Sequence, residues 1–423
     1  MSRRNFLLLL LLVSFLIRVA AVDALRNPSR GPELEQMGAD GVEFNILGLH
    51  LAETHKYELV KGIPTSFRAP GFPLVLAAIY SSVGENYRVV YAALCFLGAV
   101  TCIFSYLLAC ELLSEKWARI ASLLCVFYIP HIYFATVFAS ENVFAALLPA
   151  ALWCFVRYFK TQKINMLLGA GLILGLATLT RPFALLIVPM WLVLLFLESR
   201  ARIRLRIFAI FMLLAGFLVV TVPWSIRNYY AFHRFVAVAT NGGSTFYGSN
   251  NDRVLSEPYY YGNWIPTTEL PHRDVIDATP DEVTRDKVEW SLGLSWVSAH
   301  FLSMPLLSSF KLIRLWLPRV DTENKHYFLA ELLGYTPIAV LFFLGAIRTI
   351  REKAFRIAEF TGIHSIILAT IITALIFYGS ARFRDANAAI IVVYAAVGLR
   401  WIWMLSQQWS SRAWVMESAA AQK

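Results

Sequence analysis

Long apolar runs separated by short connections rich in Lys and Arg recur along the whole chain. Hydrophobic residues make up 58% of its 423 residues and charged residues only 16%, whereas soluble domains hold roughly 45–50% and 25%. A run of about 20 apolar residues is long enough to cross the hydrocarbon core of a bilayer as a helix. The sequence therefore predicts an all-α polytopic membrane protein.

The apolar runs predict about ten transmembrane helices, within a range of roughly 10 to 13. The predicted spans are 5–22, 87–112, 119–138, 142–158, 166–180, 182–197, 207–225, 332–348, 362–378 and 387–404. They form a single transmembrane domain over residues 1–423. A long loop follows the first span at about 23–86, a second covers 227–327, and 405–423 form a tail.

The basic connections between spans orient the chain. Short loops rich in Lys and Arg stay in the cytoplasm, and such loops occur at 114–119, 157–163, 198–206 and 348–356. We therefore expect a multi-pass protein of the bacterial cytoplasmic (inner) membrane with both termini in the cytoplasm. This pattern accounts for the net charge of +10 without a nucleic-acid partner.

The first hydrophobic segment, the cysteines and the lack of common motifs narrow the possible classes of protein. The segment has the basic start, apolar core and small residues of a signal peptide, but we expect an uncleaved anchor; either way the first loop lies outside. All five cysteines fall in predicted spans, so no disulfide framework or metal-type spacing is present. The sequence also lacks the Walker A, Rossmann and zincin motifs.

The first loop contains an acidic stretch, "MGADGVEFNILGLHLAETHKY". A helix over 42–53 would carry two apolar stripes and could lie on the membrane. Gly38 and Gly41 flank Asp40, which suggests a bend that brings this carboxylate to the lipid surface. Alternatively, Asp40 caps the helix. The segment at 297–318, with Lys311 and Arg314 among apolar residues, is a second candidate interfacial helix.

Four more charged residues lie at the predicted outer boundary. Arg68 precedes a rigid "PGFP" turn and suits a phosphate ligand, although an interfacial Arg also extends to water without any ligand. Glu141, in "SEN", is either a functional acid or one favoured by the helix dipole. Arg382 and Arg384, in "ARFRD", could bind the same phosphate or simply reach water.

The second loop begins with "TNGGSTFYGSNND". Asn241, Gly242, Gly243 and Asn250 could present amide and backbone N–H groups to a sugar or phosphate. A structural turn stabilised by Asn side chains explains the same pattern. The acidic run at 273–287 is expected to be a solvated helix without a catalytic residue.

Taken in order, the segments "VFASENVFAAL", "LATLTRPFALL" and "PWSIRNYYAFHRFVAVATNGGSTFYGSNN" resemble the bacterial C-class membrane glycosyltransferases. This group is related to the protein O-mannosyltransferases and the lipid A aminoarabinose transferase. The resemblance covers about residues 5 to 250. It implies transfer of a hexose or pentose from a polyprenyl-phosphate donor to a lipid, glycan or protein acceptor outside the cytoplasmic membrane.

The resemblance also assigns roles. It implies that Asp40 acts as the base, that Glu141 assists it, and that displacement inverts the anomeric carbon. The leaving phosphate needs fixed cations, for which Arg68, Arg181 and Arg227 are the candidates at the outer boundary. No cofactor is required by these residues, but a divalent cation could bind near Asp40 and Glu141.

Two other classes remain open on sequence grounds. A transporter or flippase of lipid-linked sugars also needs many spans and intramembrane charges, and a non-catalytic envelope-assembly subunit needs no chemistry. Transporters usually carry internal repeats and broken helices at the bilayer midplane. We find no convincing repeat, and the charges gather at one boundary, which favours the transferase.

Overall fold

The computed structural model describes residues 1–31, 34–198, 202–318, 325–352 and 358–420. Within these ranges the chain is almost entirely helical, and its two strands form one short antiparallel hairpin. In chain order the elements are α1 (Arg3–Leu25), α2 (Leu34–Thr54), β1 (Glu58–Val60), β2 (Ile63–Pro64), α3 (Gly71–Val83), α4 (Tyr87–Leu112), α5 (Glu115–Val126), α6 (Ile129–Phe134), α7 (Ser140–Thr161), α8 (Asn165–Thr180), the 3-10 helix η1 (Pro182–Leu186), α9 (Ile187–Leu197), α10 (Ile203–Phe232), α11 (Gly242–Gly248), α12 (Asp252–Ser256), η2 (Pro258–Tyr260), η3 (Thr267–Glu269), α13 (Arg273–Asp277), α14 (Glu282–Ala299), η4 (Phe301–Ser303), α15 (Met304–Trp316), α16 (Lys325–Arg351), α17 (Ala358–Ile376), α18 (Ala381–Asp385) and α19 (Ala388–Ala420).

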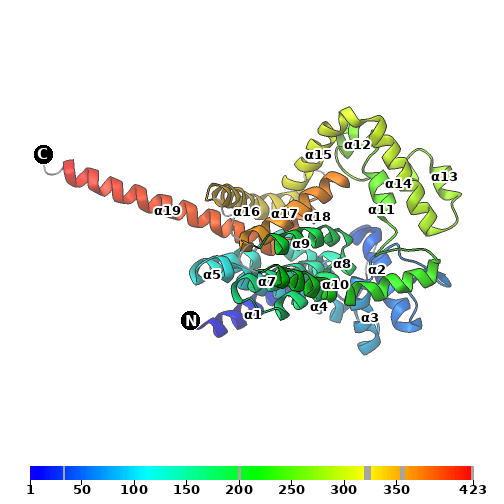
Figure 1. Ribbon diagram of the computed structural model, residues 1–423, viewed down its shortest axis with the longest axis horizontal. Helices are drawn as coiled ribbons and strands as arrows, with labels where there is room; N and C mark the ends of the chain where they lie inside the picture. Colours follow the sequence, from blue (N-terminus) through cyan, green and yellow to red (C-terminus); the bar gives the residue numbers. More distant parts are fainter. Residues whose placement is uncertain (32–33, 199–201, 319–324, 353–357, 421–423) are drawn as a thin grey trace.

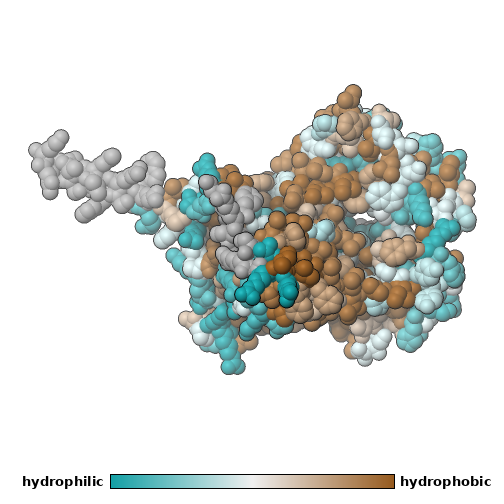
Figure 2. Space-filling model, viewed as in Figure 1, coloured by the Kyte–Doolittle hydropathy of each residue, from teal (hydrophilic) through white to brown (hydrophobic). Residues whose placement is uncertain are grey.

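Six helices in the described ranges are long and apolar enough to cross a membrane, namely α1, α4, α7, α10, α16 and α19. Each coincides with a predicted span. Shorter apolar helices, α8, α9 with η1, and α17, occupy the predicted spans at 166–180, 182–197 and 362–378. Figure 2 shows apolar side chains over the middle of the visible face and hydrophilic ones toward its two ends. The all-α polytopic fold is confirmed.

The predicted span at 119–138 is not one continuous helix. Helix α5 ends at Val126, and α6 covers only Ile129–Phe134. Pro130 lies in the first turn of α6, where its missing N–H costs no helical hydrogen bond; inside a single long helix it would cost one. The prediction failed here because the apolar run continues across the break in the backbone.

Small residues let the helices of the bundle approach closely. A Cβ atom on Gly171 of α8 would lie 2.1 Å from the carbonyl oxygen of Leu213 on α10, and one on Gly216 would lie 2.4 Å from that of Leu168. Small residues at such contacts are typical of helix pairs in membranes, where van der Waals packing drives association. The contact fixes α8, and with it the turn at its end.

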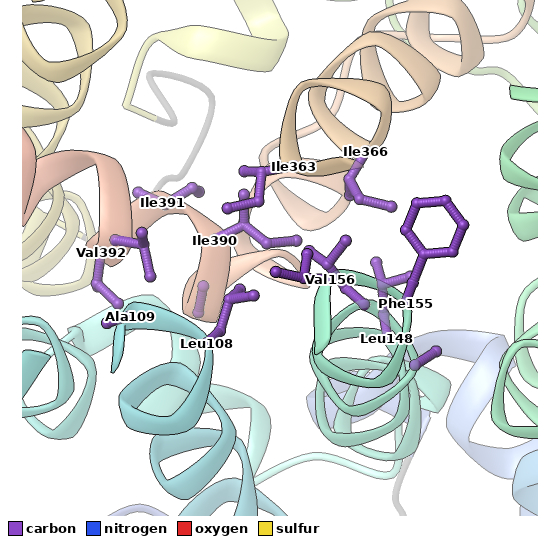
Figure 3. Close-up of a cluster of buried hydrophobic side chains, with 14 of the residues drawn as sticks. Leu108, Ala109, Leu148, Phe155, Val156, Ile363, Ile366, Ile390, Ile391 and Val392 are labelled. Atoms are coloured by element: carbon purple, nitrogen blue, oxygen red, sulfur yellow. The ribbon is translucent and has the colours of Figure 1, made fainter. Parts of the chain in front are cut away.

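A buried apolar core lies where α4, α7, α17 and α19 meet. Figure 3 shows Leu108 of α4, Phe155 and Val156 of α7, Ile363 of α17 and Ile390 of α19 with their side chains turned toward one another. These side chains are at most 1% exposed. Because Ile390 lies at the start of α19, the core also holds the short helix α18, which directly precedes α19.

The long loops gather at one end of the molecule. Figure 1 shows α2 and α3 of the first loop and α11 to α14 of the second loop at the end opposite the start of α1 and the far end of α19. The start of α1 and the far end of α19 therefore lie on the same side of the bundle, an arrangement compatible with the predicted topology.

The first-loop helix begins earlier than expected. The sequence predicted a helix over 42–53 with Asp40 in a bend or at its N-cap, whereas α2 starts at Leu34 and contains Asp40 in its second turn. Gly38 and Gly41 are thus tolerated inside a helix, at a cost of about 1 kcal/mol each relative to Ala. Packing against α3 offsets this cost, with the rings of Phe44 and Phe72 5.3 Å apart.

The expected interfacial helix at 297–318 is α15, with Leu306 and Ile313 exposed. Lys311 differs from the expectation, because its side chain is fully buried. Its Nζ donates to Asn250 Oδ1 at 2.9 Å and to the Leu375 carbonyl at 3.1 Å. A buried Lys needs such acceptors, so α15 is tied to the end of α17.

Candidate active site

Connections that lie far apart in the sequence bring six charged side chains together. They are three acids and three arginines, which we call the acid–arginine cluster: Asp40 and Glu43 on α2, Arg68 before α3, Glu141 in the first turn of α7, Arg181 after α8 and Arg382 on α18. The cluster joins the first long loop to three of the short turns that were predicted on the same side of the membrane.

Arg68 and Arg382 hold Asp40 from two sides. The distance from Arg68 Nη2 to Asp40 Oδ1 is 2.7 Å, and that from Arg382 Nη1 to Asp40 Oδ2 is 3.3 Å. Arg68 Nε also reaches Glu43 Oε2 at 2.5 Å. Asp40 and Glu43 are three residues apart, so they share one face of α2 and a single guanidinium bridges them.

Arg382 and Arg181 hold Glu141. Arg382 Nε lies 2.6 Å from Glu141 Oε1, and Arg181 Nη1 lies 2.7 Å from the same oxygen. Arg382 therefore links the two carboxylates that were expected to be catalytic. The ion pairs run without interruption from Glu43 to Arg181.

The backbone around Glu141 explains its position. An acid in the first turn of a helix is favoured by the helix dipole, by about 0.3–1 kcal/mol. The turn before α7 is fixed by Asn142, whose Nδ2 donates to the carbonyls of Phe134 at 2.7 Å and Ala139 at 3.2 Å. The "SEN" triplet thus shapes its own turn and directs the acid into the cluster.

A close contact between α3 and α8 brings Arg68 and Arg181 to the same place. A Cβ atom on Gly71, at the start of α3, would lie 2.3 Å from Thr180 Oγ1 and 2.8 Å from Thr180 Cα. Arg181 is the residue after Thr180, and Pro182 ends the helix there. Any larger residue at position 71 would push the two arginines apart.

The cluster is partly open to solvent at Asp40 and closed at Glu141. The Asp40 side chain is 34% exposed, whereas that of Glu141 is 0% exposed. Aromatic rings form part of the wall: Arg68 lies 5.0 Å from the Phe67 ring centroid and Arg181 lies 5.6 Å from that of Phe383. A ligand entering from outside would therefore meet Asp40 before Glu141.

The arginines keep Asp40 ionised. Burial on its own would raise the pKa of Asp40, but the positive charges of Arg68 and Arg382 outweigh this effect and lower the pKa below its usual value. The pKa of Arg68 is raised, because the attraction of Asp40 and Glu43 exceeds the effect of burial. In this state Asp40 is a carboxylate and a weak base.

The structure gives two residues a larger place than the sequence did. The sequence predicted that Arg382 either binds a phosphate or reaches water. In the structure its guanidinium bridges Asp40 and Glu141. Glu43 had no assigned role, although its spacing from Asp40 was a usable signal. Nothing in the sequence near Arg382 indicates that its partners lie some 240 to 340 positions earlier.

Arg384 belongs to a different group. We call Arg384, Asp385 and Glu331 the buried arginine triad. Arg384 Nε lies 2.8 Å from Asp385 Oδ1, and Nη2 lies 3.0 Å from Glu331 Oε1. Tyr335 stacks on the guanidinium at 3.4 Å, and Tyr128 donates its hydroxyl to Asp385 at 2.6 Å. Arg384 is 0% exposed, so it neither reaches water nor faces the cluster.

Arg227 does not join the cluster. Its Nη1 donates to the carbonyl of Thr65 at 2.8 Å and its Nη2 to that of Tyr57 at 3.0 Å. The guanidinium also lies over the rings of Trp224 and Tyr57. In this arrangement Arg227 holds the backbone of the first loop.

The "TNGG" segment is packed against α14. The N–H of Gly243 donates to Asp286 Oδ1 at 2.6 Å, and a Cβ atom at this position would lie 2.1 Å from the Asp286 carbonyl. Asn250 is 1% exposed, and its Nδ2 donates to the Phe246 and Ile376 carbonyls. Asn241 and Gly242 form the start of α11, with Gly242 against Trp290.

A divalent cation at the expected place near Asp40 and Glu141 would meet an arginine there. The described residues contain no group of three or more His, Cys, Asp or Glu side chains that could hold one. The expected place near Asp40 and Glu141 is taken by the Arg382 guanidinium, which contacts both carboxylates. A hard cation binds carboxylate oxygens directly and would have to displace this arginine.

The chain has the fold of the C-class membrane glycosyltransferases, a helical membrane bundle, and its acids and arginines gather at one end of that bundle. Residues 67–226 match the family model described as dolichyl-phosphate-mannose-protein mannosyltransferase. The matched region contains Arg68, Glu141 and Arg181 of the cluster. A comparison with curated protein sequences found no match.

Two solved structures of an archaeal oligosaccharyltransferase share this fold. The oligosaccharyltransferase AglB from Archaeoglobus fulgidus, in complex with an inhibitory peptide and a dolichol-phosphate, is 13% identical with a TM-score of 0.55, over 97% of this chain and 52% of that chain. Its complex with zinc and sulfate is 15% identical with a TM-score of 0.55, over 98% and 51%. ArnT from Cupriavidus metallidurans bound to undecaprenyl phosphate is 14% identical with a TM-score of 0.45, over 94% and 78%. The chain spans about half the length of the oligosaccharyltransferase chains that it matches.

Proposed function

We propose that this protein is a membrane glycosyltransferase that moves a hexose or pentose from a polyprenyl-phosphate donor to an acceptor hydroxyl or phosphate. The acceptor is part of a lipid, a glycan or a protein on the outer face of the bacterial cytoplasmic membrane. The family match at 67–226 and the fold support this class of activity. The dolichol-phosphate in the AglB complex supports a lipid phosphate as part of the donor.

One observation carries the proposal: in the acid–arginine cluster, three guanidinium groups are linked through shared carboxylates, with Asp40 between Arg68 and Arg382 and Glu141 between Arg382 and Arg181. Arginines bind phosphate and carboxylate oxygens in the same forked geometry. A donor phosphate can therefore replace a carboxylate on Arg68, Arg382 or Arg181. Such an exchange keeps the arginines paired at every stage.

Replacement by phosphate also activates Asp40. The pKa of Asp40 is low because Arg68 and Arg382 face it. When a donor phosphate takes those arginines, burial remains and the carboxylate becomes a stronger base. Donor binding would thus prepare the base for the reaction, and only in the complex that needs it.

The reaction itself is a single displacement. Asp40 takes the proton of the acceptor hydroxyl as its oxygen attacks the anomeric carbon, and the bond between that carbon and the phosphate oxygen breaks. The polyprenyl phosphate leaves with the bonding electrons, and the arginines stabilise its charge. Attack opposite to the leaving group inverts the anomeric configuration.

Glu141 acts through the arginines. It is fully buried, and both of its cluster partners are guanidinium groups, so it holds Arg181 and Arg382 in place while the phosphate binds. No step of this scheme passes through a metal ion. A divalent cation at Asp40 and Glu141 would compete with Arg382 for the same oxygens.

The proposed topology puts the cluster on the outer side and both termini in the cytoplasm. Figure 1 supports it, because the two ends of the chain lie opposite the loops. Reporter fusions at positions 140 and 250 should report the outer side. A cytoplasmic signal at either position would contradict the location of the active site.

The function is tested in cells that lack the protein, complemented with wild type, with Asp40→Asn or with Glu53→Gln. Glu53 is an exposed acid of the same helix and serves as the control. Mass spectrometry of lipid-linked sugars and envelope glycans should show that the deletion and Asp40→Asn accumulate one polyprenyl-phosphate sugar and lose one glycan. Full complementation by Asp40→Asn would exclude the transferase mechanism and favour transport or assembly.

A further inference from the structure

Two residues of the first loop, Thr65 and Ser66, are buried between the loops and are 4% and 0% exposed. Their backbone groups bond to residues from other segments. The Thr65 N–H donates to the Tyr57 carbonyl at 3.1 Å, and the Ser66 carbonyl accepts from the Thr240 N–H at 3.0 Å. Arg227 donates to the Thr65 carbonyl at 2.8 Å.

The remaining backbone donor of this pair bonds to Glu282, the first residue of α14. Glu282 Oε1 accepts from the Ser66 N–H at 2.7 Å, and Oε2 accepts from Thr65 Oγ1 at 2.6 Å. Oε1 also accepts from the hydroxyl of Thr240. One carboxylate of the second loop therefore receives three hydrogen bonds, two of them from the first loop.

The same two residues lead directly to the cluster. The N–H of Phe67 donates to Thr65 Oγ1 at 3.0 Å, and the Tyr57 hydroxyl donates to the Arg68 carbonyl at 2.9 Å. The Phe67 ring lies under the Arg68 guanidinium. Arg68 is thus two residues from a segment whose backbone groups are hydrogen-bonded to other segments, and its own carbonyl is held by Tyr57, the residue before β1.

We propose that Glu282 is a positioning residue: from the second loop it holds Thr65 and Ser66, and thereby aims the Arg68 guanidinium at Asp40 and at the donor phosphate. This inference rests on the proposed function. It gives a role to an acid in the run at 273–287, which was expected to be solvated. It also makes the second loop part of donor binding, although the described cluster has no residue from that loop.

The chemistry of the contact requires a carboxylate. Three donors converge on two oxygens, and a carboxylate accepts all three, whereas the amide of Gln has one acceptor oxygen and two donor hydrogens. In Glu282→Gln at least one donor of the first loop faces an N–H group. The segment before Arg68 then loses its fixed position without any change in Arg68 itself.

The experiment measures equilibrium binding of undecaprenyl phosphate to the purified full-length protein in detergent. The variants are Glu282→Gln, Arg68→Ala, and the two combined, with Asp277→Asn as control. Asp277 is an exposed acid of the same loop, paired with Arg273. We expect Glu282→Gln to raise the Kd by about tenfold, the effect of losing a hydrogen bond to a charged group. Asp277→Asn should leave the Kd unchanged.

The double variant separates positioning from general damage. If Glu282 acts through Arg68, Glu282→Gln has no further effect on the Kd in the Arg68→Ala background. The same loss in both backgrounds, or an unchanged Kd in Glu282→Gln, would overturn the inference. If Glu282→Gln does not yield folded protein, Thr65→Val is used instead, because it removes one contact to Glu282. The double-mutant cycle of Thr65→Val with Arg68→Ala then tests the inference in the same way.

The outcome also distinguishes this inference from the proposed function. If the wild type does not bind undecaprenyl phosphate, the proposed donor class is wrong and the inference falls with it. If the wild type binds and Arg68→Ala weakens binding while Glu282→Gln does not, the proposed donor class stands and only the role of Glu282 is refuted.

Discussion

Helix α18 carries two arginines, two residues apart, that differ in almost every property except their charge. Arg382 lies in the acid–arginine cluster and is 33% exposed, whereas Arg384 lies in the buried arginine triad and is 0% exposed. Each contacts two carboxylates. Successive side chains of a helix point about 100° apart, so two positions place them on different sides of α18.

The difference shows how the same ion pairs can serve a reaction or a fold. In the triad, Tyr335 covers the guanidinium and Tyr128 bonds Asp385, so no ligand can replace a carboxylate. In the cluster, the partly open Asp40 is the carboxylate that the proposed donor phosphate would displace. Exposure, and not the number of charges, separates the two regions.

The largest expected effect comes from making the same change in both regions. Asp40→Asn should lower the transfer rate by about 10²–10⁴-fold, because a general base is lost, with little change in Tm. Asp385→Asn should lower Tm while the folded fraction keeps its transfer rate. Single-turnover assays and thermal unfolding of the two purified variants check this. A transfer rate near that of the wild type in Asp40→Asn would exclude Asp40 as the base.

Arg384→Met should destabilise the fold more than any change in the cluster. It leaves Glu331 and Asp385 buried without their cation, which costs about 3–5 kcal/mol. Arg273→Met is the matched control, because Arg273 is an exposed arginine paired with Asp277 and such pairs contribute about 0–1 kcal/mol. Equal Tm values for the two variants would mean that the triad does not stabilise the protein.

Arg68→Lys tests whether the cluster depends on the forked shape of arginine. Lysine keeps the charge but cannot contact Asp40 and Glu43 with separate nitrogens of one planar group. We expect the KM for the donor to rise by about tenfold, equivalent to roughly 1.4 kcal/mol, with a smaller change in kcat. Steady-state kinetics measure both constants. Arg234→Lys is the control, because Arg234 is an exposed arginine.

A smaller effect, a dependence of Tm on pH, is expected from acids that lack a close cation. On α14, burial raises the pKa of Glu289 to about 7, and its hydroxyl partner Thr267 offsets this only in part. The raised pKa means that Glu289 favours the folded state at low pH and that this contribution is lost as the pH rises through about 7. Tm should therefore fall between about pH 4.5 and 7, and less steeply in Glu289→Gln. Parallel pH profiles for the two proteins would contradict this.

The sequence was sufficient for the fold class and for much of the cluster. Apolar runs and basic loops placed Asp40, Arg68, Glu141 and Arg181 on one side of the membrane, and the structure brings these four together. Predicting which side of the membrane each residue lies on is enough to group these four, because the bilayer confines such residues to one thin layer. It reduces a three-dimensional problem to the question of which loop ends meet.

The same reasoning could not separate residues within that layer. Arg227 and Arg382 are both at the predicted boundary, yet one holds backbone carbonyls and the other bridges two acids. Hydrophobic periodicity does not predict how α18 is rotated about its axis or which path the hairpin takes. The helix break at Pro130 and the early start of α2 were missed because local propensity yields to packing in both places.

The three acids and three arginines of the cluster cancel one another at neutral pH. A site without net charge creates little field at a distance, so it neither draws anions from solution nor concentrates them. Free phosphate, chloride and other soluble anions are therefore not attracted to it from a distance. A donor anchored in the bilayer does not need such attraction, since it arrives by sliding within the plane of the membrane. If the protein is the proposed transferase, its binding of the donor is therefore expected to depend little on ionic strength and on the concentration of small anions.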